Sequence, residues 1–169
     1  MASAINDRGQ IVVNVNQADG NFHALLVNPG GTVFQNLGKG TYANDLNDLG
    51  QVVGSLNGHA ILYDRGRVQD LGTGAASDIN NFGVIAGGGS GSGFVYFPGV
   101  GRRNLQDLTP GIFTNHSDAT GAGPFEGYLI TGAVGINDRG QIAANADFFF
   151  LGDQQAHERA VILTPHFSK

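Results

Sequence analysis

A segment that occurs four times is the feature that most constrains how this 169-residue chain can fold. The four copies read AINDRGQIVVNV from Ala4, DLNDLGQVVGSL from Asp45, DINNFGVIAGGG from Asp78 and GINDRGQIAANA from Gly135. Repetition at a fixed period is typical of arrays of supersecondary units, and a period of about 35 to 40 residues lies within the range of propeller blades. The chain is therefore expected to be built from four copies of one small unit.

Up to two further segments follow each copy and complete the unit. The second segment is apolar and reads HALLV from His23, HAILY from His59, GFVYF from Gly93 and RAVIL from Arg159. The third segment follows in the first three units only, as GTVFQNLG, GRVQDLG and GRRNLQDL. These segments place the units at about residues 4–41, 42–74, 75–108 and 132–169 of a single domain, with an insertion at about 109–131.

The residue types of the unit predict β-hairpins. The Asn-Asp-x-Gly core favours a tight turn, because Asn and Asp bond to nearby backbone groups and Gly tolerates positive φ. The stretches on either side are rich in β-branched and small residues, and no helical period is found. We therefore predict an all-β fold, a β-propeller of four to five short blades. Closure within one chain is favoured, with the insertion adding a fifth blade and the N-terminal strand completing the last unit. An open arc that dimerises is the alternative.

Composition narrows the class of protein and of partner. The chain has 28 glycines and 41% hydrophobic residues, which predicts frequent turns between short strands rather than disorder. A net charge of −5 with only nine Lys and Arg argues against nucleic acid, whose phosphates need clustered basic residues. The chain has no cysteine for a disulfide, a thiol nucleophile or a Cys-based zinc site. No signal peptide and no apolar run of about 20 residues are found, so no membrane span is predicted.

The units resemble a known family of repeats. The pattern AxxINDxGQVVG, followed by HAxLY and xVQDLG, is similar to the HAF repeat family of bacterial proteins, named for a His-Ala-Phe triplet. The triplet stands as His23-Ala24-Leu25 and His59-Ala60-Ile61, is lost at Gly93-Phe94-Val95 and is displaced at Arg159-Ala160-Val161. The resemblance implies an extracellular or periplasmic location, and it does not imply an activity, because a fold alone does not determine one.

The candidate ligand-binding residues fall into three groups. The repeated positions Asp7, Asp48 and Asp138, with Asn81 in the third unit, are expected at one end of the sheets, where they either bind a ligand or shape turns. His59 is a further ligand-binding candidate at the start of a strand, although a histidine bonded to backbone is the simpler interpretation. The insertion adds His116, Asp118 and Tyr128, because long loops on rigid scaffolds commonly carry binding or catalysis. No metal motif and no cofactor is indicated.

Two classes of function follow from these residues. The first is a non-catalytic module, monomeric or homodimeric, that binds carbohydrate. The second is a glycoside hydrolase, which needs two carboxyl groups roughly 5 to 9 Å apart. Its candidates are Glu126 and Glu158, the only glutamates, together with Asp138. A structural or adhesive segment that binds protein is a third interpretation.

Overall fold

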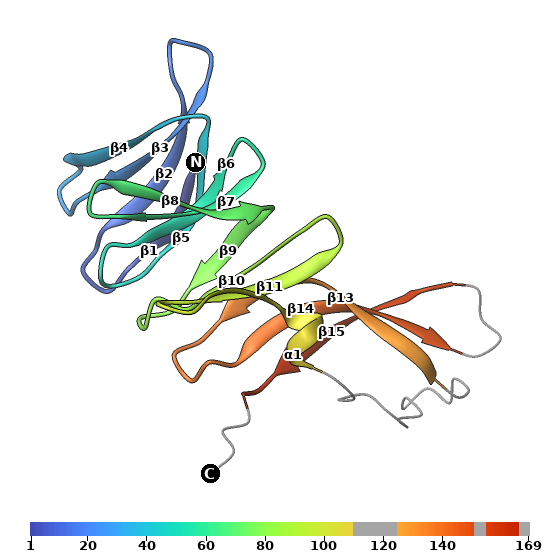
Figure 1. Cartoon of the computed structure of the whole chain (residues 1–169). Coiled ribbons are helices and arrows are strands. Elements are labelled where there is room, and N and C mark those ends of the chain that lie inside the picture. The colour runs from blue at the N-terminus through green and yellow to red at the C-terminus, as the bar shows by residue number, and fades with distance from the viewer. Residues whose placement is uncertain (110–124, 151–154, 166–169) are drawn as a thin grey trace.

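The structure is a computed structural model that describes residues 1–109, 125–150 and 155–165. Within these residues it is all-β, with fifteen strands and one short helix, and the strands form four separate antiparallel sheets (Figure 1). The predicted all-β class is therefore confirmed.

In each sheet the strands pair in the order in which they occur in the chain. The first sheet contains β1 (Ala2–Ile5), β2 (Ile11–Asn16), β3 (Phe22–Val27) and β4 (Val33–Lys39). The second contains β5 (Thr41–Leu46), β6 (Val52–Leu56), β7 (His59–Asp64) and β8 (Arg67–Thr73). The third contains β9 (Ala75–Ile79), β10 (Ile85–Gly89), β11 (Ser92–Phe97) and β12 (Gly101–Asn104), and α1 (Leu105–Leu108) follows it. The fourth contains β13 (Phe125–Ile136), β14 (Ile142–Phe150) and β15 (His157–Leu163).

The turns explain why the strands are so short and so regular. The connections at Asn57-Gly58, Arg65-Gly66 and Ser90-Gly91 have positive φ at both residues, as in the tight hairpin turns that match the twist of the strands. Every first hairpin also has a β-bulge, between Ala2 and Ala4 in the first sheet and at the corresponding places in the others. The same backbone path is thus repeated four times.

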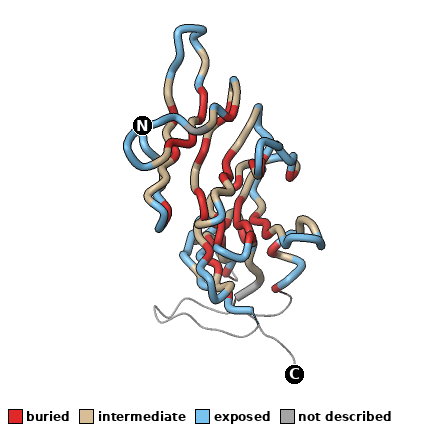
Figure 2. Tube along the Cα trace, turned by 90° about the vertical axis from the view of Figure 1, so that its left-hand side faces the viewer, coloured by how far each residue is buried: buried red, intermediate tan, exposed pale blue. Residues whose placement is uncertain are grey.

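Close packing between sheets is made possible by small residues. A Cβ atom added to Gly88 on β10 would lie 3.0 Å from the Cα atom of Gly132 on β13 of the next sheet, which leaves little room for a side chain there. The buried apolar residues gather in three clusters, one between each pair of successive sheets. Figure 2 shows these buried segments running through the middle of the molecule while the turns are exposed. Each sheet is therefore stabilised by burial against its neighbours rather than by a core of its own.

The stack of sheets is open. The first strands β1, β5, β9 and β13 contact one another in series, and Figure 1 places the first and the fourth sheet at opposite ends of the row. The prediction of closure within one chain was wrong, because the apolar residues Ile5 and Ile162 that a closed ring would cover remain exposed at the two ends. The propeller itself is not confirmed.

The predicted fifth blade and the predicted completion of the last unit are also not found in the described residues. Phe125–Ile136 form one long strand, so the end of the predicted insertion extends β13 instead of starting a new sheet. β1 pairs with β2 in the first sheet and does not join the fourth, which has three strands. The N-terminal strand is therefore already used within its own hairpin.

Candidate functional site

Each sheet turns from its first to its second strand through an asparagine that organises the turn. In the second sheet, Asn47 Oδ1 accepts hydrogen bonds from the backbone N–H groups of Leu49 and Gln51, at 3.0 and 3.1 Å. Gly50 follows with a φ of 76°, which a residue with a side chain rarely adopts. Equivalent pairs of bonds are accepted by Asn6, Asn80 and Asn137. The Asn-Asp-x-Gly motif is therefore a turn in which asparagine satisfies the backbone.

The same asparagines connect each sheet to the next. Asn6 Nδ2 donates to the backbone oxygen of Asn47 at 3.0 Å, and Asn47 Nδ2 donates to that of Asn80 at 3.1 Å. Asn80 Nδ2 donates to the oxygen of Asn137 at 3.1 Å. The three donating asparagines are buried, whereas Asn137 is exposed. Because these amides are buried and each donates to the next sheet, they form a ladder that holds the four turns in register.

The repeated aspartates form a second ladder beside the first. The backbone N–H of Asp7 donates to Asp48 Oδ1 at 2.8 Å, and that of Asp48 donates to Asn81 Oδ1 at 2.9 Å. The backbone N–H of Asn81 donates to Asp138 Oδ1 at 2.8 Å. Asp48 and Asp138 therefore join neighbouring sheets in addition to shaping their own turns. Asp48 uses one carboxylate oxygen for this bond, whereas Asp138 uses both, since its Oδ2 also accepts from Asn81 Nδ2 at 3.2 Å.

The two ladders form the floor of a shallow groove, the turn groove, which crosses all four sheets. Its volume is about 310 Å³ and its lining is almost entirely polar. It is lined by Ile5, Asn6, Asp7, Leu46, Asn47, Asp48, Ile79, Asn80, Asn81, Ile136, Asn137 and Asp138. Phe82, the residue after Asn81, has 69% of its surface exposed. The groove therefore offers a repeating row of amide and carboxylate groups to solvent, with an exposed aromatic ring next to it in the chain.

A carboxyl pair links the sheets one residue before the anchoring apolar positions. Asp45 Oδ2 accepts from the backbone N–H of Ile79 at 3.0 Å, and Asp78 Oδ2 accepts from that of Ile136 at 2.6 Å. Burial, and a hydrogen bond with the Asp78 carboxyl, raise the pKa of Asp45 to about 7. Sequence reasoning missed this pair, although the sequence carries a signal for it, since aspartate directly precedes the anchoring residue in the second and third units.

The histidine candidate lies away from the turn groove. His59 Nδ1 lies 2.9 Å from Asp70 Oδ2, and both side chains are largely exposed. The pKa of Asp70 is lowered, first by the backbone N–H of Gly72 and then by His59. His59 therefore bonds to a side chain rather than to backbone, contrary to the simpler of the two interpretations.

The insertion residues have different outcomes. His116 and Asp118 lie outside the described residues. Tyr128 lies on β13, where its hydroxyl donates to the backbone oxygen of Thr109 and its ring packs against Phe148, with 6.3 Å between centroids. Tyr128 therefore ties α1 to the fourth sheet.

The carboxyl groups predicted for catalysis do not come together at Asp138. Glu158 pairs with Asp147 on β14, whereas Asp138 lies beyond the level at which Ile136 pairs with Ile142. At about 3.3 Å per residue these two levels are about 16 Å apart along the strand, which exceeds the separation that glycoside hydrolysis requires. Glu126 is the second residue of β13, whereas Asp138 follows the other end of that strand.

A second hollow, of about 520 Å³, lies between the first two sheets. Its lining includes Arg8, Gln10, Gln35, Tyr63 and Arg65. Sequence reasoning missed it because these residues come from separate turns and strands with no shared motif.

Other kinds of site were also sought in the part of the chain that the structure describes. It contains no group of three or more His, Asp or Glu residues placed to hold a metal ion. In the same residues no helix has both the length and the apolar character needed to cross a membrane.

Comparison with known proteins adds no relative. No protein-family model matches the chain, and neither does any curated protein or any solved structure. The resemblance to HAF repeats therefore remains a prediction, and any function must be argued from the geometry above.

Proposed function

We propose that this chain is a non-catalytic module that binds an extended glycan along the turn groove. The observation that carries the proposal is the groove itself, since one shallow polar channel crosses all four sheets and presents equivalent groups at each step. Small-molecule sites are usually concave and largely apolar, which this groove is not. A polymer of hydroxyl-rich units suits it better, because Asn and Asp side chains both accept hydrogen bonds from hydroxyl groups and Asn also donates.

Three details support a glycan over other polymers. Asp48 uses one carboxylate oxygen to accept from the neighbouring sheet, which leaves its other oxygen to accept from a ligand hydroxyl. Phe82 supplies an exposed ring on which the apolar face of a sugar can lie. With a net charge of −5, the chain is poorly suited to phosphate polymers.

The propeller-like nature of the sheets belongs to the same proposal. The first three sheets are four-stranded meanders whose first strands contact one another in series, as the blades of a propeller do. Membership of the HAF repeat family and an extracellular or periplasmic location are proposed on the sequence resemblance alone.

The proposal can be tested by affinity electrophoresis of the purified chain through gels that contain single polysaccharides, followed by titration calorimetry on those that retard it. Phe82→Ala is expected to weaken binding about tenfold, the effect of losing about 1.4 kcal/mol. Asp48→Asn should also weaken it without loss of folding, because the amide keeps the Oδ1 that accepts from Asp7, as Asn81 does for Asp48.

Phe22→Ala is the matched control, since Phe22 is an exposed ring at the opposite end of its sheet. Equal weakening by Phe22→Ala and Phe82→Ala would contradict a site at the groove, and so would the absence of binding to any polysaccharide. Turnover of nitrophenyl glycosides by the parent chain would contradict a non-catalytic role.

A further inference from the structure

The two ends of the stack expose apolar residues at positions that are buried at every interface between neighbouring sheets. At the start of the stack, Ile5 has 69% of its surface exposed, whereas Leu46 at the same position of the second unit has 4%. Ile79 and Ile136, at that position in the remaining units, are buried as well. Val13 and Leu25, which pair across β2 and β3, are also only partly covered on this face. We call this surface the leading face.

The other end of the stack exposes the opposite side of a sheet. Ala143 and Ile162 pair across β14 and β15, and Ile162 has 73% of its surface exposed. The corresponding pairs in the first three sheets are all buried: Val12 with Leu26, Val53 with Leu62, and Ala86 with Val95. Val134 on β13 is also exposed. We call this surface the trailing face.

The polar groups at the two ends are complementary in the same way. On the trailing face, Asn137 Nδ2 donates only to Gln141 within its own turn, and the backbone N–H of Asp138 has no acceptor among the described residues. On the leading face, the backbone oxygen of Asn6 and the carboxylate of Asp7 receive no bond from another sheet in the described part of the chain. These are the donors and acceptors that the two ladders join at each interior step.

We propose that the trailing face of one copy of this chain docks on the leading face of a second copy. A second copy is the partner that fits each face, because the trailing and leading faces are the two halves of an interface that the chain already forms three times between its own sheets. A docked copy would bury Ile5 against the Ala143–Ile162 pair and extend both ladders by one step, from Asn137 to Asn6 and from Asp138 to Asp7. Such a contact is heterologous, because it joins two different faces. Two copies close a ring if the trailing face of each docks on the leading face of the other. If the angles do not allow closure, further copies add to the free ends and form longer chains.

The contact can be tested by sedimentation velocity on the full chain over a range of concentrations. We expect the parent to associate as concentration rises, and Ile5→Lys and Ile162→Lys each to remain monomeric. Both side chains are exposed, so a lysine there should leave each monomer folded, which circular dichroism can verify. Val100→Lys is the control: Val100 is similarly exposed, at 61%, but lies on the turn between β11 and β12, and its variant should associate like the parent.

Mixing the two variants tests the head-to-tail geometry. Ile5→Lys keeps an intact trailing face and Ile162→Lys keeps an intact leading face, so an equimolar mixture should form a 1:1 complex that grows no larger. A parent chain that stays monomeric at all concentrations would overturn the proposal. Self-association of either variant alone, or a mixture that remains monomeric, would overturn it as well.

Discussion

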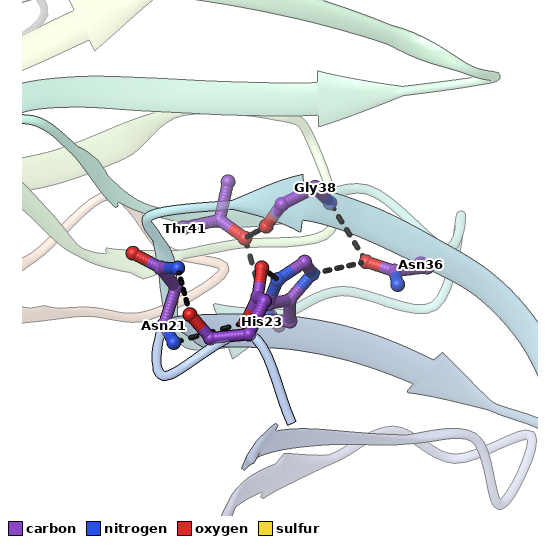
Figure 3. A network of polar contacts seen from close by, with 7 residues as sticks. Asn21, His23, Asn36, Gly38 and Thr41 are labelled. Atoms are coloured by element: carbon purple, nitrogen blue, oxygen red, sulfur yellow. Dashed lines mark hydrogen bonds and ion pairs between the residues drawn. The ribbon is translucent and has the colours of Figure 1, made fainter. Parts of the chain in front are cut away.

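The two ends of the sheets are built on different principles. At the turn end, the four asparagines accept the same pair of bonds and three of them reach the next sheet in the same way. At the opposite end, His23 of the first sheet bonds to Asn36 (Figure 3) and to Asp19, while His59 of the second sheet bonds to Asp70 alone. The turn end therefore joins successive sheets through repeated asparagines, whereas each of these histidines bonds within its own sheet.

The largest expected effect tests how much the asparagine bond between sheets adds to stability beyond the bonds within the turn. Asn47→Ala removes four hydrogen bonds at a buried site, two to its own turn, one to Gln51 and one to the next sheet. We expect it to lower the free energy of unfolding by about 3 kcal/mol. Asn137→Ala removes the same bonds except the one to a next sheet, from an exposed turn, and should cost about 1 kcal/mol.

Urea unfolding of both variants, followed by circular dichroism, measures the difference. Equal destabilisation by Asn47→Ala and Asn137→Ala would mean that the bond between sheets contributes nothing. Hydrogen exchange should in addition show that Asn47→Ala loosens the second and third sheets before the first, because the lost bond leads from the second sheet to Asn80.

A smaller effect is expected from the carboxyl pair at the turn end. The pKa of Asp45 is raised to about 7 by burial and by Asp78, against about 3.9 in an unfolded chain. The folded state therefore holds this proton more tightly, so its stabilising effect is full below about pH 4 and is lost as the pH rises through about 7. Asp45 is only partly buried, so we expect the chain to be more stable at pH 5 than at pH 8 by about 1 to 2 kcal/mol.

Asp45→Asn supplies the control for this pH dependence. The amide oxygen can still accept from the N–H of Ile79, but no proton titrates, so the difference in stability between pH 5 and pH 8 should shrink. The carboxyls with lowered pKa, Asp19 and Asp70, stay ionised over this range and do not interfere. A parent chain of equal stability at both pH values would contradict the pairing.

Features that depend on a local motif could be predicted from the sequence, and features that depend on how the sheets stack could not. The turn end was predictable in outline, because Asn-Asp-x-Gly has a local physical meaning that does not depend on the rest of the fold. The ladder bond from Asn6 to Asn47 was not, since it joins residues far apart in the chain. Closure of the ring was predicted wrongly because it depends on the angle between successive sheets, for which no short motif carries a signal. The groove required both the turns and their stacking, so the sequence indicated its residues but not its shape.

The smallest expected effect lies at the end where the sheets differ. His23 is buried and both ring nitrogens have partners, Asn36 Oδ1 at 3.3 Å and Asp19 Oδ2 at 3.2 Å, so His23→Ala should lower the free energy of unfolding by about 1 to 2 kcal/mol. His59 is largely exposed, and His59→Ala should change it by less than about 0.5 kcal/mol. Thermal unfolding of the two variants compares them directly. A larger loss from His59→Ala would show that the second sheet depends on this end as much as the first, and the contrast between the two ends would then hold for one sheet only.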